Sequence, residues 1–429
     1  MAEAFSASPV QVYPSGSNAS AWSQTHVQRP GLLFVPGPVT PQYDPSQIYL
    51  GFSMMDGASY PYPEGWILSY DVDLSPSTEN AYQVTDSKTN VDAGGGVWMD
   101  GAGLAAGHDS YGVTSIYPAT GNGYFDLDSS GGVNGSDSLL KLTTHLTLAT
   151  SSGITPYFTP SDQCHRDCES GGTNVDSDFG SGGVLLVPDN TLPNHWPFIM
   201  LNGDKEGFIW VEDRTSLGGY NGANTSYSHC SSDTSCVSSC TNACQAPNLM
   251  DQQVSPPSGQ TWHIHTSPAF WSGTSSESPS VYYIGNQGFG PKPTRFPLCD
   301  SSSGGPICAS STWQFNNSEA FKGGATPAVS WDGTNANSAI VWAILNPADA
   351  LDDGSGLTAL RAFSATSMAL LYDSHADCPT RDNTGPGTKF SVPTVANGLV
   401  FMGTQLVPAG HGAANTDFDI FGPVSATCN

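Results

Sequence analysis

The sequence predicts an all-β protein built from repeated units of short strands. Runs of β-branched and aromatic residues alternate along the chain with clusters of Gly, Pro, Ser, Asn and Asp, which are typical of turns. A tryptophan-bearing segment flanked by glycines, clearest from 94 to 126, recurs in degenerate form. Radial repetition of three- or four-stranded sheets protects sheet edges, so this pattern favours a β-propeller over a pair of packed sheets.

The expected strands fall into groups of one order: an apolar strand of small residues, a turn, an aromatic strand with glycine, a loop, and a strand ending in an acidic or aromatic residue. Several groups open on a small or β-branched residue followed by proline, as at Ser267, Thr326 and Val392. No stretch has the spacing of a long amphipathic helix, and 364–371 holds at most one helical turn. We expect about six antiparallel blades, with a range of roughly five to eight. The expected strands lie at 31–35, 47–52 and 65–71; 98–106, 112–117, 138–142 and 157–159; 182–189, 197–201 and 207–211; 262–268 and 281–285; 325–330, 339–344 and 360–363; and 391–404 and 418–421.

A shift in composition divides the chain near residue 29. Residues 1–28 are rich in Ser, Pro, Gly and Gln, and we expect them to form a lead-in segment. The length of 429 residues allows two or three average domains or one large all-β domain. Because strand groups recur from 29 onward, we expect a single propeller domain over 29–429, with long disulfide-bearing loops near 160–178 and 222–260.

The balance of charged residues limits which classes of binding partner are expected. The chain has 12 Lys and Arg against 38 Asp and Glu, which gives a formal net charge of −26. Such a field repels nucleic acid and anionic lipid, so both are excluded as expected partners. No apolar run approaches the roughly 18 residues that a membrane span needs. Surface polarity carried by Ser, Thr, Asn and Gly suits an acidic, secreted, extracellular protein.

Ten cysteines support an oxidising compartment, because they are closely spaced within loop-like stretches. An even count in an acidic, lysine-poor chain favours disulfides. The alternative is a zinc–thiolate site at the four cysteines between 230 and 244, but the usual two-residue spacing is absent. Cys378 is a candidate partner of Cys428 at the end of the chain. The expected disulfide cysteines are Cys164, Cys168, Cys230, Cys236, Cys240, Cys244, Cys299, Cys308, Cys378 and Cys428.

Four Asn-x-Ser/Thr tripeptides agree with secretion and predict glycosylation at Asn18, Asn134, Asn224 and Asn316. Such tripeptides also arise by chance in serine-rich chains. The segment that starts at Met1 lacks the basic start and apolar core of a signal peptide. We therefore expect either that a leader was removed or that the natural N-terminus lies upstream.

Four segments resemble the quinoprotein, or pyrroloquinoline-quinone-repeat, β-propellers. These segments are 94–126, 178–189, 207–214 and 389–398, and the likeness extends over roughly 29–422. More narrowly, the chain resembles a secreted group of these proteins whose function is uncertain. Members of that group carry further repeats before the unit that begins here at Arg29. The resemblance thus implies a ring that is smaller, incomplete at the N-terminus, or closed by another chain.

The same resemblance implies two functions. Cofactor-dependent relatives are oxidoreductases that use pyrroloquinoline quinone or a metal ion, here copper, zinc or calcium, on sugars or alcohols. The chain has neither an adjacent Cys-Cys pair nor a Cys-x-x-Cys-His haem motif, and analogy of fold is a weak basis for a cofactor. We therefore favour an extracellular binding or scaffold protein for a polysaccharide or small molecule, with an oxidoreductase as the alternative.

His263 and His265 form the sharpest candidate site. Two residues apart on an expected strand, they point to the same face, as two ligands of one copper or zinc ion would. A third ligand must come from elsewhere, and Asp100, His108 or His195 are candidates. The alternative is that the pair is solvated or hydrogen-bonded at a strand end.

The loops at one end of a propeller channel are the expected place for a site. Asp204-Lys205-Glu206 follows an apolar strand, and a lysine between two carboxylates can do acid–base chemistry in a desolvated channel mouth. The alternative is a charged hairpin tip. The candidate channel-mouth residues are Asp100, His108, His195, Asp204, Lys205 and Glu206.

Other motifs are weaker. The acidic segments 126–128 and 352–354 can supply oxygen ligands to calcium, but neither completes the hand-type loop, so we interpret them as acidic turns. Ser181 lacks the Gly-x-Ser-x-Gly spacing of a serine hydrolase. Tryptophans on strands are expected to pack within blades, with one or two stacking on sugar rings at the channel mouth; they are Trp66, Trp98, Trp210, Trp262 and Trp342.

Overall fold

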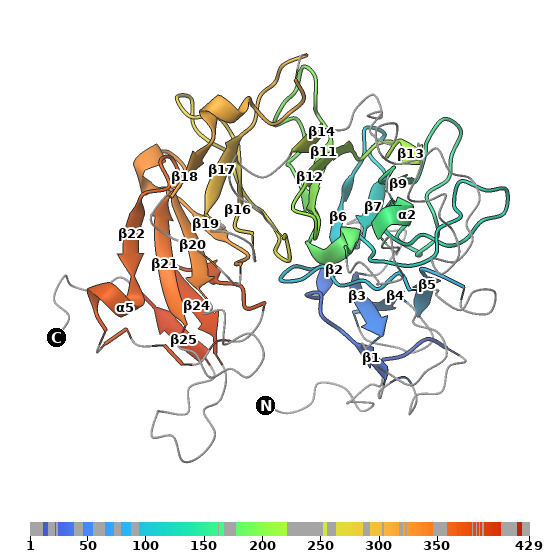
Figure 1. Ribbon diagram of the computed structural model, residues 1–429, viewed down its shortest axis with the longest axis horizontal. Helices are drawn as coiled ribbons and strands as arrows, with labels where there is room; N and C mark the ends of the chain where they lie inside the picture. Colours follow the sequence, from blue (N-terminus) through green and yellow to red (C-terminus); the bar gives the residue numbers. More distant parts are fainter. Residues whose placement is uncertain are drawn as a thin grey trace. The chain divides into compact units, whose positions relative to one another are not determined.

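The computed structural model (Figure 1) describes residues 12–15, 22, 25–37, 46–54, 65–72, 79–86, 94–161, 163–166, 177–220, 252–254, 263–285, 292–302, 304–316, 321, 324–345, 358–379, 381–382, 384–385, 387, 390–404 and 418–422, and every structural statement below refers to these residues. Strands are the main regular secondary structure in these residues. The α-helices that they contain are single turns, α2 (Gln163–Arg166) and α5 (Ser374–Asp377). None of the helices found there has the length and apolar character needed to cross a membrane.

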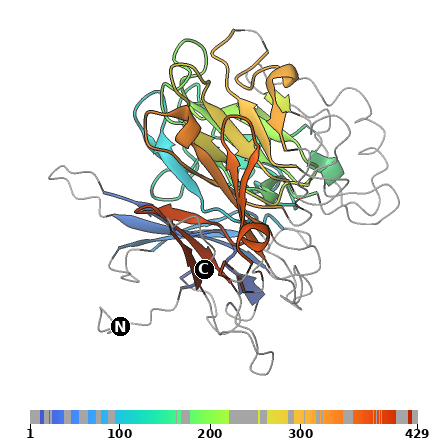
Figure 2. The same cartoon turned by 90° about the vertical axis from the view of Figure 1, so that its left-hand side faces the viewer.

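The prediction of an all-β, propeller-type fold is confirmed. Three sheets, whose strands lie between residues 269 and 315, 328 and 373, and 394 and 421, are antiparallel with three or four strands, and in them neighbours in the sheet are neighbours in the chain (Figures 1 and 2). This sequential antiparallel order is that of a propeller blade. The number of blades stays a prediction.

Contacts divide the chain into two compact units. Unit 1 comprises Met1–Met99, Gly103–Leu186 and Glu212–Met250, and unit 2 comprises Asp100–Ala102, Val187–Val211 and Asp251–Asn429. The sequence analysis expected one domain from residue 29, and the chain passes between the two units several times rather than once.

Unit 1 contains a five-stranded sheet and two smaller sheets. In the first sheet the order is β1-β3-β4-β5, with β2 also paired to β3. The second pairs β6 with β7, and the third has the order β13-β9-β8, in which β13 and β9 are parallel. The strands of unit 1 are β1 (His26–Val27), β2 (Leu33–Val35), β3 (Gln47–Met54), β4 (Trp66–Asp71), β5 (Asn80–Gln83), β6 (Ala105–His108), β7 (Thr114–Tyr117), β8 (Leu139–Leu140), β9 (Tyr157–Thr159), β10 (Leu185–Leu186) and β13 (Gly219–Tyr220).

The expected lead-in segment contributes to the core of unit 1. Trp22 is buried with Phe52 and Leu68, and its ring stacks on His26 with centroids 3.7 Å apart. His26 and Val27 then form β1 on the edge of β3. Composition alone does not reveal this, because one aromatic side chain is enough to hold a polar segment against a sheet.

Unit 2 contains antiparallel sheets that follow the chain. Their strands are β11 (Ile199–Gly203), β12 (Ile209–Asp213, of which the last two residues belong to unit 1) and β14 (Gln252–Val254); β15 (Ala269–Trp271), β16 (Ser280–Tyr283), β17 (Thr294–Pro297) and β18 (Gln314–Phe315); β19 (Ala328–Ser330), β20 (Ile340–Leu345), β21 (Ala359–Ser364) and β22 (Leu370–Asp373); and β23 (Thr394–Ala396), β24 (Leu399–Gly403) and β25 (Phe418–Phe421). The sequence allowed one helical turn at 364–371. These residues instead form a non-helical turn that leads from β21 into β22.

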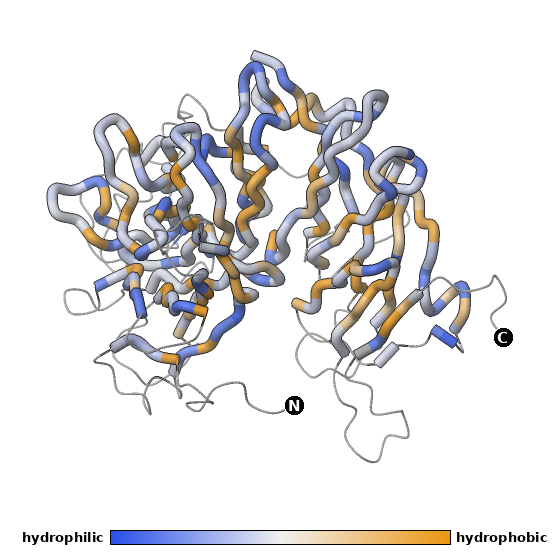
Figure 3. Tube along the Cα trace, turned by 180° about the vertical axis from the view of Figure 1, so that it is seen from behind, coloured by the Kyte–Doolittle hydropathy of each residue, from blue (hydrophilic) through white to orange (hydrophobic). Residues whose placement is uncertain are grey.

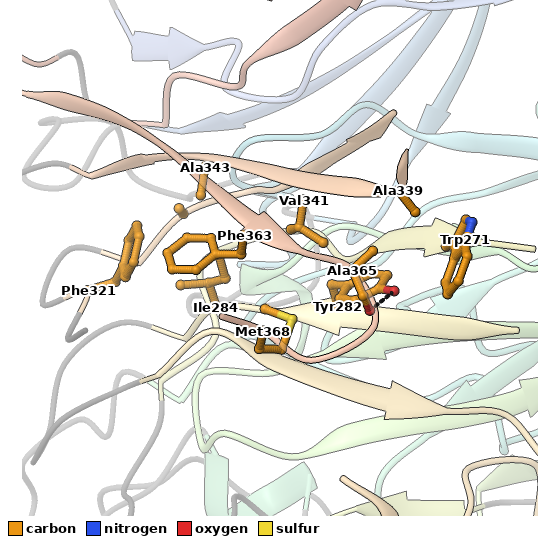
Figure 4. Close-up of a cluster of buried hydrophobic side chains, with 11 residues drawn as sticks. Trp271, Tyr282, Ile284, Phe321, Ala339, Val341, Ala343, Phe363, Ala365 and Met368 are labelled. Atoms are coloured by element: carbon orange, nitrogen blue, oxygen red, sulfur yellow. Dashed lines mark hydrogen bonds between the residues drawn. The ribbon is translucent and has the colours of Figure 1, made fainter. Parts of the chain in front are cut away.

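Strand β20 has an apolar cluster on each of its two faces. Val341 and Ala343 pack with Phe363 in one buried cluster (Figure 4), whereas Ile344 and Trp342 belong to a second. Successive side chains of a strand point to opposite faces, so both faces of β20 are covered. Figure 3 shows the resulting mixture of hydrophobic and hydrophilic positions along the strands.

The described cysteines bear on the disulfide prediction. Cys299 and Cys308 are bonded to each other, and Cys378 is also disulfide-bonded. Cys164 belongs to α2, but its side chain lies outside the described part. The other expected disulfide cysteines, which lie wholly outside it, are Cys168, Cys230, Cys236, Cys240, Cys244 and Cys428.

Two of the four expected glycosylation sites are described, and both are buried. The side-chain nitrogen of Asn134 donates to Asp126, and that of Asn316 donates to the carbonyl of Met368. A glycan at either nitrogen would displace a hydrogen bond, and an unpaired buried polar group is destabilising. Asn18 and Asn224 lie outside the described residues, where glycosylation stays a prediction.

Candidate functional site

The candidate site is a histidine–aspartate pair in unit 2. Nδ1 of His265 lies 3.2 Å from Oδ2 of Asp100, although the two residues are 165 positions apart. The Asp100 side chain is 1% exposed and that of His265 is 16% exposed. A buried carboxylate therefore faces one nitrogen of a ring that solvent still reaches.

Thr326 holds the two chain segments that carry this pair. Its Oγ1 accepts a hydrogen bond of 3.0 Å from the backbone N–H of Ser267. The same oxygen would lie 2.3 Å from a Cβ at Gly101, which has φ of +74°. Only glycine combines this left-handed conformation with so close an approach. Asp100 and His265 are thus placed by residues on either side of Thr326.

The backbone alternation of 263–265 agrees with the sequence expectation. Ile264 is fully buried, and its Cγ2 would lie 2.5 Å from a Cβ at Gly203. His263 and His265 are both partly exposed. Because neighbouring side chains in an extended segment alternate, both histidines lie on the face opposite Ile264.

The hydrogen bonds of Asp204 hold its own turn and the segment that carries the two histidines. Its carboxylate accepts hydrogen bonds from the backbone N–H of Phe208 (2.8 Å) and from Nε1 of Trp210 (2.7 Å). Its carbonyl accepts the N–H of Ile264 at 3.0 Å. Burial raises the pKa of Tyr283 well above its ordinary value, and the nearby charge of Asp204 raises it further. The use of both carboxylate oxygens favours the hairpin turn over acid–base chemistry at this position.

The other candidate channel-mouth residues do not join this pair. His195 also contacts a carboxylate, because its Nδ1 lies 3.2 Å from Oδ1 of Asp300, but its side chain is 38% exposed. His108 belongs to unit 1 and is exposed, while Lys205 and Glu206 are partly buried beside Asp204.

No group of three or more His, Cys, Asp or Glu side chains in the described part of the chain is arranged to hold a metal ion. The third ligand expected beside His263 and His265 is thus not brought to them there, and metal binding by the pair stays a prediction. Asp126, one of the expected calcium ligands, is committed to Asn134 and Val133. The segment 352–354 lies outside the described residues.

The indole ring of Trp98 is already packed against other residues of the chain. Pyrroloquinoline quinone is a flat tricarboxylate, so its site needs an open aromatic face and positive charge. The guanidinium of Arg29 lies 4.4 Å from the ring centroid of Trp98, and a Cβ at Gly96 or Gly121 would come within 3.0 Å of indole atoms. Trp98 is therefore packed as the sequence analysis expected. Four other described cations are in ion pairs: Lys141, Arg295, Arg361 and Arg381.

The chemistry of the pair follows from the acceptor character of the carboxylate. An ionised carboxylate only accepts hydrogen bonds, so Asp100 favours a proton on Nδ1 of His265 and leaves Nε2 as an acceptor. The nitrogen can take a hydrogen bond from a ligand hydroxyl or accept a proton from it. The sequence analysis did not assign a site role to Thr326 or Ser267, although both stand in the recurrent small-residue–proline steps.

The comparisons with known proteins concern the fold. No family model and no curated protein matches the chain. The quinohemoprotein alcohol dehydrogenase of Comamonas testosteroni is 13% identical, with a TM-score of 0.36 over 83% of this chain and 54% of that one. A europium-containing methanol dehydrogenase is 12% identical, with a TM-score of 0.37 over 83% and 64%. Sqt1 of Chaetomium thermophilum is 11% identical, with a TM-score of 0.32 over 88% and 81%.

The chain thus spans about half the length of the alcohol dehydrogenase it matches, 54%. At such identities and TM-scores, no activity or ligand follows for this chain.

Proposed function

We propose that the protein is an extracellular binding protein that holds a neutral, hydroxyl-rich ligand, such as a segment of polysaccharide, at His265. The observation that carries this proposal is the Asp100–His265 pair, in which a buried carboxylate orients a partly exposed imidazole. An imidazole fixed in this way presents one acceptor nitrogen in a defined direction, and sugar hydroxyls are donors that suit it.

The charge of the chain supports an uncharged ligand. A net charge of −26 repels anionic polysaccharides at a distance. Hydroxyl groups avoid this repulsion and need no counter-charge in the site.

The disulfides support the extracellular assignment. Cys299 and Cys308 are bonded, and Cys378 is bonded as well. Such bonds persist in oxidising compartments and are rare in reducing ones.

Retention of the full chain on insoluble neutral glycans tests the proposal. We expect the wild-type protein to be retained on at least one glycan, and His265→Ala to weaken retention about tenfold, because one hydrogen bond in a partly desolvated site is lost. His195→Ala, which removes the ring of an exposed His–Asp pair, should leave retention unchanged.

Two results would contradict the proposal. One is equal retention of the wild type and His265→Ala. The other is turnover of a sugar or alcohol with an artificial electron acceptor after quinone and calcium are added, which would favour the oxidoreductase.

A further inference from the structure

A second candidate site lies in unit 1 around Phe125, in the clearest repeat segment. Phe125 is fully buried, and its ring centroid lies 5.8 Å from that of Tyr157 and 5.0 Å from that of Tyr220. Tyr157 in β9 and Tyr220 in β13 belong to neighbouring parallel strands. Both rings are partly exposed, as is that of Tyr124. We call Tyr124, Tyr157, Tyr220 and Asp128 the tyrosine cluster.

Backbone pairing places the segments that carry these residues side by side, although they are distant in the sequence. Phe125 forms a bridge with Gly135. A Cβ at Gly135 would lie 3.1 Å from both Leu127 and Leu140, and Leu140 pairs with Tyr157. The segment that carries Tyr124 and Asp128 therefore runs beside β9.

The two carboxylates of this segment have different roles. Asp126 accepts hydrogen bonds from Val133 and from the backbone and side chain of Asn134, so it holds the turn. Asp128 is exposed, and the hydrogen bond it receives comes from its neighbour Ser129 at 3.3 Å. Its charge is therefore available to a ligand.

The carboxylates of this segment add to the effect of burial on the pKa values of the tyrosines. Burial raises the pKa of Tyr157, and Asp128 raises it further. Burial likewise raises the pKa of Tyr124, with further contributions from Asp126 and Asp128. The hydroxyl of Tyr82 is buried with no hydrogen-bond partner in the described part of the chain, and its pKa is raised by burial and then by Asp126.

We propose that the tyrosine cluster binds the alkylammonium group of a small organic cation. Tyrosine rings attract a cation to their faces, and the carboxylate of Asp128 supplies the opposite charge. An anion would be repelled by Asp128, and a neutral apolar group would gain nothing from it. The cluster shares no residue with the His265 site, so this proposal is independent of the proposed function.

Choline chloride and 3,3-dimethylbutan-1-ol are matched probes, because the alcohol has the shape of choline without its charge. Each is titrated into the full chain, and broadening of its methyl resonance is followed by NMR. We expect choline to bind about twofold to fivefold more tightly than the alcohol. This difference in affinity is typical of an exposed cation–π contact. Equal binding of both probes, or no binding of choline, would overturn the proposal.

Variants locate the site. Asp128→Asn and Tyr157→Ala should each weaken choline binding, whereas Tyr157→Phe keeps the ring and should bind as the wild type does. Asp189→Asn removes an exposed carboxylate outside the cluster and is the charge-matched control. Because Asp128 is exposed, Asp128→Asn does not threaten folding, and its outcome stands even if Tyr157→Ala is unstable. Equal losses in Asp128→Asn and Asp189→Asn would mean unspecific attraction and contradict the proposal.

Discussion

Residues of one kind have different roles in this chain, and burial distinguishes them. His265 and His195 each lie 3.2 Å from a carboxylate oxygen. Asp300 accepts hydrogen bonds from the backbone and side chain of both Asn194 and His195, so it organises an exposed turn. Burial alone would raise the pKa of Asp300, but the hydrogen bonds from Asn194 and His195 lower it. Asp100, by contrast, is buried under a ring that solvent reaches.

A buried ion pair at the residue scale makes the stability of the fold depend on pH. Nζ of Lys141 lies 2.8 Å from Oδ2 of Asp109, with side chains 1% and 3% exposed. Burial acts to raise the pKa of Asp109, but hydrogen bonds from Lys141, Val113 and Tyr111 outweigh it and hold the pKa below 3.8. A lowered folded pKa means that the stabilisation is complete above the unfolded pKa and is lost as pH falls through the folded pKa.

Lys141→Met should therefore lower the free energy of unfolding at neutral pH by about 3–5 kcal/mol, because it leaves Asp109 charged and buried. The difference from the wild type should shrink as pH falls through the lowered pKa of Asp109 in the folded wild type, because protonation of the carboxylate removes the stabilisation by the ion pair. Urea unfolding at several pH values measures both. A loss that is independent of pH would show that Lys141 acts by packing alone.

At the scale of elements, two glycines with the same backbone conformation allow the cost of backbone strain to be distinguished from the cost of a steric clash. Gly101 and Gly112 both have φ of +74°, but a Cβ at Gly101 would lie 2.3 Å from Oγ1 of Thr326, whereas Gly112 has nothing within 4 Å. Gly112→Ala should lower the free energy of unfolding by about 1 kcal/mol, the penalty of a left-handed non-glycine residue.

Gly101→Ala should lower the free energy of unfolding by about 1–3 kcal/mol more than Gly112→Ala, because the added methyl group must displace Thr326. It should also weaken ligand binding, since Asp100 is adjacent. Thermal unfolding of the two variants gives the comparison. Equal losses would mean that Thr326 yields without resistance and does not position Asp100.

The elements also show what the sequence could predict. Alternating apolar and turn residues predicted the strands around β20, because local pattern decides which face is buried. The same period of two predicted His263 and His265 on one face, and both are partly exposed on either side of the buried Ile264. The pairing of Asp100 with His265 could not be predicted, because it depends on how segments 165 positions apart meet. The role of Asp204 in its own turn agrees with the charged hairpin tip that the sequence offered as an alternative at 204–206.

At the scale of the whole molecule, disulfides add to the stability that buried apolar clusters already give the sheets. The bond between Cys299 and Cys308 closes a loop of sequence separation 9. Replacing both by serine should lower the free energy of unfolding by about 2–3 kcal/mol, because closure of so short a loop limits the unfolded chain. A lower midpoint of urea unfolding is the expected result. No change in midpoint would show that the bond does not contribute to stability.

The central claim is that a buried carboxylate makes His265 a ligand-binding group, and paired carboxylate variants test it most directly. The measurement is the affinity for a retained neutral glycan of the wild type, Asp100→Asn and Asp300→Asn, by calorimetry. Asp100→Asn should weaken binding about tenfold, because the amide no longer fixes the proton on Nδ1, while Asp300→Asn should bind as the wild type does. Wild-type affinity in Asp100→Asn, or an equal loss in both variants, would contradict the account.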